Sequence, residues 1–79
     1  MKKLPDTYRT FVINIHHIKK GDRKRKFYRT HQRIMVGEGA FAVLHRARQK
    51  VREFNEQYRD RSDVDELVVG ALGLKKQTL

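Results

Sequence analysis

The sequence predicts an α+β domain in which a small antiparallel β-hairpin packs on a long amphipathic helix and a short C-terminal helix. Two segments rich in β-branched and aromatic residues, 8–18 and 27–36, flank a basic connection. Apolar residues then recur with a helical period over residues 40–58 and again over 63–72. A chain of 79 residues has room for one small core, so we expect a single domain, 1–79, with the element order ββαα.

Each strand is expected to have one buried face. In the first strand, Phe11, Ile13 and Ile15 share a face. In the second, Arg29 and Arg33 lie on the face opposite to the mostly uncharged residues. We therefore expect a hairpin with one buried face and one cationic face. A third strand could lie within residues 1–7 or the connecting loop.

Two helices are expected after the hairpin, the first beginning after the glycines that flank Glu38. The apolar stripe of this first helix consists of Ala40, Val43, Leu44, Ala47, Val51, Phe54 and Tyr58. For the second helix, Ser62 and Asp65 match a capping box and Gly73 is the expected C-terminal stop. The stripe of the second helix consists of Val64, Leu67, Val68 and Ala71. Residues 1–7 and 75–79 are expected to be flexible.

The feature most informative about function is the basic loop, residues 19–26, in which six of eight residues are Lys or Arg. Unpaired charges are too costly to bury, so we expect this loop to project as a flexible, exposed element. Residues 1–52 carry a net charge of +12 and residues 53–79 a net charge of −2. Such polarity is typical of nucleic-acid-binding proteins, and ribosomal proteins, membrane-surface binders and proteins that dock on acidic partners are also strongly basic.

Several kinds of chemistry are not expected. The chain has no Cys, which excludes disulfides and thiol nucleophiles and suits an intracellular compartment. No apolar run approaches the ~20 residues that span a membrane, so we expect a cytoplasmic protein. The adjacent His16 and His17 point to opposite faces of a strand, with no acidic residue near them in the sequence. We therefore predict no enzyme activity, no metal and no cofactor.

We interpret the chain as a small non-catalytic nucleic-acid-binding protein that favours duplex DNA over RNA. Few exposed aromatic residues are expected, so contacts to the phosphate backbone should outweigh stacking on bases. The cations expected to hold phosphates are Lys19, Lys20, Arg23, Lys24, Arg25, Lys26, Arg29, Arg33, Arg48 and Arg52. The alternative is a small inhibitor or adaptor, of a phage or plasmid type, that docks its basic face on an acidic nucleic-acid-binding site of a protein or ribonucleoprotein.

Residues 11–58 also resemble two known families in element order and charge. A basic hairpin followed by a helix is similar to the arm-type DNA-binding domains of tyrosine integrases and to the sheet-plus-helix of double-stranded RNA-binding domains. Both families have three strands, whereas the hairpin predicted here has two.

The C-terminal segment raises the question of oligomeric state. Val69 and Leu72 fall outside the main stripe of the second predicted helix, and the acidic C-terminal third does not repel a second copy. These observations predict a homodimer through residues 63–72, with the basic hairpins facing outward. The alternative is a monomer in which both side chains cover the edge of the sheet.

Overall fold

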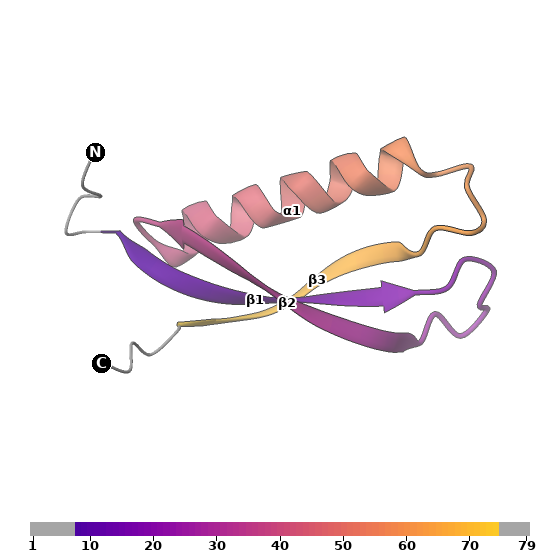
Figure 1. Cartoon of the computed structure of the whole chain (residues 1–79), viewed down its shortest axis with the longest axis horizontal. Helices are drawn as coiled ribbons and strands as arrows, with labels where there is room; N and C mark the ends of the chain where they lie inside the picture. Colours follow the sequence, from indigo (N-terminus) through magenta and orange to yellow (C-terminus); the bar gives the residue numbers. More distant parts are fainter. Residues whose placement is uncertain (1–7, 75–79) are drawn as a thin grey trace.

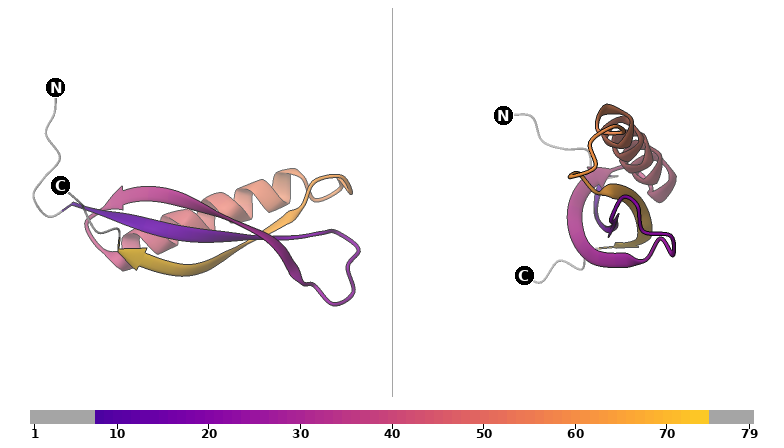
Figure 2. Two further views of the ribbon diagram at one scale, coloured as in Figure 1. Left: turned by 60° about the horizontal axis from the view of Figure 1, so that its bottom comes forward. Right: turned by 90° about the vertical axis from the view of Figure 1, so that its right-hand side faces the viewer.

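The protein consists of a three-stranded antiparallel sheet with one helix lying across one of its faces (Figure 1). The computed structural model describes the backbone of residues 8–74 and the side chains of residues 8–70. The elements in chain order are β1 (Arg9–Ile18), β2 (Phe27–Gly37), α1 (Ala40–Gln57) and β3 (Glu66–Leu74). The order in the sheet is β2-β1-β3, so β1 is central and α1 connects the two edge strands. The strands are strongly twisted around one another (Figure 2).

The structure confirms the predicted hairpin but not its expected faces. The register pairs Phe11 with Met35, Ile13 with Arg33 and Ile15 with His31. Side chains of directly paired residues lie on the same face of a sheet, so Arg33 shares the helix side with the buried Ile13. The prediction of separate buried and cationic faces is therefore wrong. The alternation of residues within each strand does not determine how two strands align with each other. A shift of the alignment by one residue moves every side chain of a strand to the other face of the sheet.

The predicted first helix is confirmed as α1, and its apolar stripe covers β1. Val43 and Ala47 are buried, and Val51 packs beside them. The helix can start close to the end of β2 because Gly37 has no side chain; a Cβ at this position would collide with Val43. The buried core consists of Phe11, Ile13, Ile15, Ile18, Val43 and Ala47. A core of this size provides little reserve of stability.

The predicted second helix is wrong, because the segment forms the edge strand β3. In the register with β1, Val69 pairs with Ile15 and Leu67 pairs with His17. The helical spacing of apolar residues in this segment is a weak, local signal, whereas pairing with β1 satisfies its backbone groups along a central strand. The homodimer through residues 63–72 itself stays a prediction, but the helical face on which it was based does not exist.

A side chain of α1 holds the beginning of β3. The Asn55 amide donates from Nδ2 to the Leu67 carbonyl at 2.9 Å, and Asn55 Oδ1 accepts from the Leu67 N–H at 2.9 Å. The amide thus pairs with the backbone of β3 much as another strand would. This contact fixes the distance between the helix and the edge strand.

The sequence also led us to expect flexible chain ends and no membrane-spanning segment. Residues 1–7 and 75–79, for which flexibility is expected, lie outside the described residues. Within the described part of the chain, no helix combines the length and apolar character that crossing a bilayer requires.

Candidate functional site

The basic loop between β1 and β2 is ordered by its own acidic residue. Asp22 accepts hydrogen bonds from the backbone N–H groups of Lys24 at 3.1 Å and Lys26 at 3.0 Å. Gly21 has a φ of 90°, a conformation that glycine adopts without strain. Asp22 therefore acts as an internal cap for the turn. Most of the loop is exposed, as expected, and its flexibility stays a prediction.

Two cations of the loop tie it to the chain that follows α1. Lys20 Nζ donates to the backbone carbonyl of Arg61 at 2.8 Å and to that of Tyr58. Arg25 makes a bidentate pair with Glu66, at 3.0 and 2.5 Å, which lowers the pKa of the Glu66 carboxyl. These two predicted phosphate ligands are therefore already engaged. They hold the basic loop against the segment before β3, at the end of the molecule where both loops meet (Figure 1).

The other cations of the loop remain available for a partner. Arg23, Lys24 and Lys26 are exposed, and within residues 8–70 no ion pair involves them. Lys19 is also exposed, with its Nζ 5.0 Å from the centre of the Tyr28 ring. The loop thus presents four exposed cations on a backbone that is hydrogen-bonded to Asp22.

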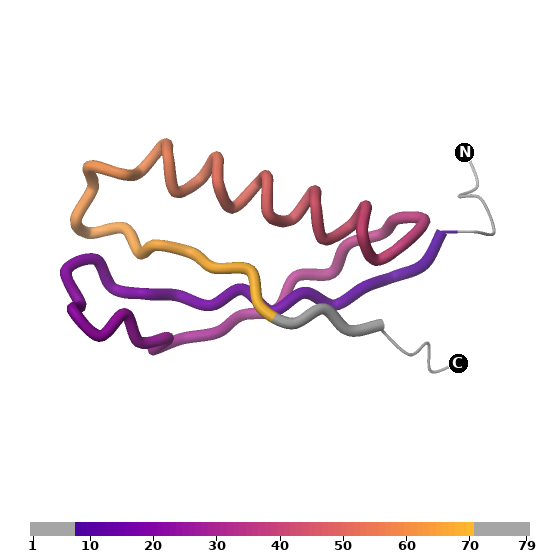
Figure 3. Tube along the Cα trace, turned by 180° about the vertical axis from the view of Figure 1, so that it is seen from behind, coloured from indigo at the N-terminus to yellow at the C-terminus, as the bar shows by residue number. Residues whose placement is uncertain are grey.

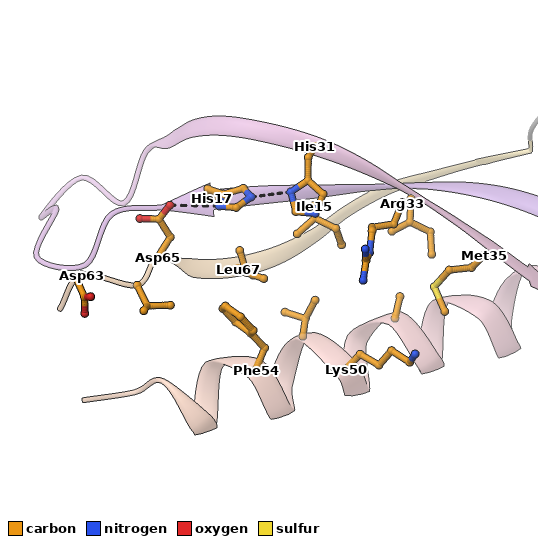
Figure 4. Close-up of a pocket in the computed structure, with 14 residues that line it drawn as sticks. Ile15, His17, His31, Arg33, Met35, Lys50, Phe54, Asp63, Asp65 and Leu67 are labelled. Atoms are coloured by element: carbon orange, nitrogen blue, oxygen red, sulfur yellow. Dashed lines mark hydrogen bonds and ion pairs between the residues drawn. The ribbon is translucent and has the colours of Figure 1, made fainter. Parts of the chain in front are cut away.

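The row of exposed cations continues along β2 and across to α1. Arg29 and Arg33 are exposed on the helix side of this edge strand. Arg33 and Lys50 of α1 line the same groove between the strand and the helix, and Figure 4 shows the Arg33 guanidinium directed toward α1. Arg46, one turn before Lys50, donates from Nη2 to the Val36 carbonyl at 2.5 Å. Lys50 and Arg46 were not among the predicted phosphate ligands. Their spacing of one helical turn places them on the same flank of α1, which is the signal in the sequence that could have identified them.

Arg48 and Arg52 lie on the opposite flank of α1. They line a second depression, between the helix and β3, together with Lys20 and the acidic Glu56 and Glu66. The structure therefore does not bring these two arginines together with Arg29 and Arg33. Nearby carboxylates also make this flank less positive than the flank along β2.

A chain of hydrogen bonds joins β1, β2 and the segment before β3. His17 Nδ1 lies 3.2 Å from Asp65 Oδ2, and His17 Nε2 lies 2.7 Å from His31 Nδ1 (Figure 4). Tyr28 also donates its hydroxyl to Asp65 Oδ2. With both rings neutral, His17 donates to Asp65 and accepts from His31. This Asp65–His17–His31 chain was missed from the sequence because Asp65 is 48 residues from His17.

Burial in this chain changes the titration of His31. Partial burial, and to a lesser degree the neighbouring His17, Arg33 and Arg29, lower the pKa of His31. The surroundings of His31 therefore favour its neutral form. We interpret the Asp65–His17–His31 chain as a set of hydrogen bonds that joins β1, β2 and the segment before β3.

The Tyr28 and His16 side chains lie at the surface of the hairpin. Tyr28 is exposed, and its hydroxyl is bonded to Asp65. His16 points to the sheet face away from α1, where it bonds Thr30 Oγ1 at 2.7 Å and stacks on Phe27 with ring centres 4.3 Å apart. His16 is also the cross-strand partner of Thr30 in the register of β1 and β2.

The arrangement of polar groups gives no independent indication of a metal or cofactor. Among the described residues, no group of three or more His, Cys, Asp or Glu side chains could hold a metal ion. Three of the four ring nitrogens of His17 and His31 are already occupied by partners in the hydrogen-bond chain.

No family model, no curated protein and no solved structure matches the chain.

Proposed function

We propose that the protein is a small, non-catalytic nucleic-acid-binding module that contacts the phosphate backbone. The observation that supports this best is the row of exposed cations from the basic loop along β2 to α1. Its members are Lys19, Arg23, Lys24, Lys26, Arg29, Arg33, Arg46 and Lys50. The acidic side chains that could neutralise such a row are largely engaged elsewhere in the structure.

The ion pairs show how the acidic residues are used. Glu66 pairs with Arg25, Asp63 with Arg61, and Glu56 with Arg59. Asp65 is held by His17 and Tyr28. Glu66 and Asp65 thus tie the segment before β3 to the β1–β2 hairpin, the other two pairs are local, and the flank along β2 keeps its positive charge.

The geometry of the row suits contact with a regular polyanion. Arg29 and Arg33 are four residues apart on an edge strand, or about 13 Å. Arg46 and Lys50 are one helical turn apart, or about 6 Å along the axis. Because the four cations of β2 and α1 sit on a strand and a helix, their backbone loses less conformational entropy on binding than the backbone of a disordered segment. Duplex DNA remains the partner we propose first, with backbone contacts that carry no sequence preference.

Salt-dependent fluorescence polarisation with a random duplex tests this proposal. We expect log Kd to depend linearly on log salt, with a slope of about 0.9 per phosphate contact. Replacing Arg23, Lys24 and Lys26 together by Ser should make the slope shallower by up to about 2.7. The matched control is Arg59→Ser, which removes an exposed arginine that is 3.0 Å from Glu56 and should leave the slope unchanged.

Two results would contradict the proposal. A wild-type affinity weaker than ~10⁻⁴ M at physiological salt falls below ordinary non-specific binding and would favour the inhibitor or adaptor that docks on an acidic protein surface. An unchanged slope in the triple variant would show that the basic loop does not contact phosphate.

A further inference from the structure

The groove between α1 and β2 is an open apolar site beside the cationic row. Its volume is about 540 Å³, within the range of sites that enclose small ligands. It exists because α1 packs more extensively on β3 than on β2, and β2 diverges from the helix toward the end of the molecule that carries the loops (Figure 3). The sheet and helix therefore leave part of their apolar surface unfilled.

The walls of the groove are apolar in the middle and charged at the ends. Ile15, Val51 and Phe54 line its interior. The cations Arg33 and Lys50 lie toward one end, and the acidic Asp63 and Asp65 lie toward the other (Figure 4). Such a site suits a ligand with a flat apolar body and a single anionic group attached to one side.

We propose that this groove receives one unpaired base of a nucleic-acid strand, with a flanking phosphate held between Arg33 and Lys50. The base lies against Ile15 and Val51 and stacks on the Phe54 ring. This inference rests on the proposed function and deepens it, because it makes the preferred ligand a duplex that ends in an unpaired nucleotide. The basic loop and Arg29 hold the duplex backbone, and the groove adds recognition of the single-stranded end.

The lining of the groove favours a base over a protein segment. Its middle is apolar and the cations that line it, Arg33 and Lys50, lie toward one end, which matches a flat ring that carries a single phosphate on one side. A base needs only a slot, and stacking on an aromatic side chain strengthens binding by about fivefold or more for any base. The two cations at the rim are placed to hold the phosphate that every base in a strand carries with it.

The test compares a blunt duplex with the same duplex carrying a short single-stranded overhang. Wild-type protein should bind the overhang at least about fivefold more tightly at equal salt. Met35→Trp fills the groove from β2 without a change of charge and should abolish this preference, while affinity for the blunt duplex stays within about twofold. Ile34→Trp is the matched control, because Ile34 is the adjacent residue, is 57% exposed and points to the opposite face; it should keep the preference.

A second pair of variants tests the same idea if Met35→Trp does not fold by circular dichroism. Arg33→Gln with Lys50→Gln should remove the preference for the overhang. Arg48→Gln with Arg52→Gln makes the same charge change on the other flank of α1 and should retain it.

The outcomes separate this inference from the proposed function. Equal wild-type affinity for both probes would overturn the base-binding groove and leave backbone binding intact, whereas no binding to either probe would overturn the proposed function itself. A preference that persists in Met35→Trp, or in Arg33→Gln with Lys50→Gln, would place the unpaired base elsewhere. A free mononucleotide that displaces the overhang at an equal concentration would overturn the strand-borne ligand and assign the groove to free nucleotides.

Discussion

Asn55→Ala should destabilise the fold through β3 alone. The substitution removes both hydrogen bonds to the half-buried Leu67 backbone, each with a net value of ~0.5–1.5 kcal/mol. Alanine is the better helix former and returns up to ~0.7 kcal/mol. The expected loss is therefore about 1–2 kcal/mol of unfolding free energy, or roughly 4–16 °C in the melting temperature of a domain of this length.

Urea unfolding followed by circular dichroism measures this loss. The control is Gln49→Ala, an exposed position in the same helix, where the helix-propensity gain occurs without any loss of a contact to β3. Amide hydrogen exchange provides a local readout, because the Leu67 N–H should exchange faster in Asn55→Ala. Equal urea midpoints for the two variants, with Leu67 still protected, would refute the role of Asn55 in holding β3.

Three further predictions follow from the packing and the hydrogen-bond chain. The pKa of His31 lies below its ordinary value of 6.5, so near and below that pH the unfolded state binds more protons than the folded state. The unfolding free energy should therefore fall as the pH drops through 6.5. Urea midpoints measured across this range should depend less on pH in His31→Gln than in the wild type. Val51→Asp replaces a side chain that packs against the core and should cost at least about 2 kcal/mol of unfolding free energy in the same assay. Gly37→Ala places a methyl group against Val43 and should lower the melting temperature through overpacking that costs ~1–3 kcal/mol.

Each of these has an outcome that would contradict it. A pH profile unchanged in His31→Gln would mean that other groups cause the acid sensitivity. A Val51→Asp protein as stable as the wild type would contradict the assignment of the inner helix face. An unaltered melting temperature in Gly37→Ala would show that β2 and α1 can separate without cost.

The sequence predicted the elements whose signals are local. The alternation of Phe11, Ile13 and Ile15 identified β1, and the period of Val43, Ala47 and Val51 identified α1 within one residue of its observed end. In both cases the burial pattern repeats within a single element, so no knowledge of a partner is required.

Features that depend on distant partners were not predicted. The segment 63–72 fits a helical period in the sequence. It nevertheless forms a strand, because Leu67 pairs with His17 of β1 and is hydrogen-bonded to Asn55 of α1. Two signals in the sequence pointed that way: the run Leu67-Val68-Val69 favours a strand, and Gly70 is unfavourable within a helix. The Asp65–His17–His31 chain had no comparable local signal, because it depends on the register and on the return of β3 to the sheet.

The positions of Arg29 and Arg33 have a consequence for solubility. They lie on β2, an eleven-residue strand at the edge of the sheet, where an uncharged edge could pair with the same edge of another molecule. Charged side chains on an edge strand are a common defence against such aggregation. Removing both arginines would therefore bring insolubility along with any loss of binding, and Arg→Lys exchanges, which keep the charge at the edge, are the safer way to examine their contacts.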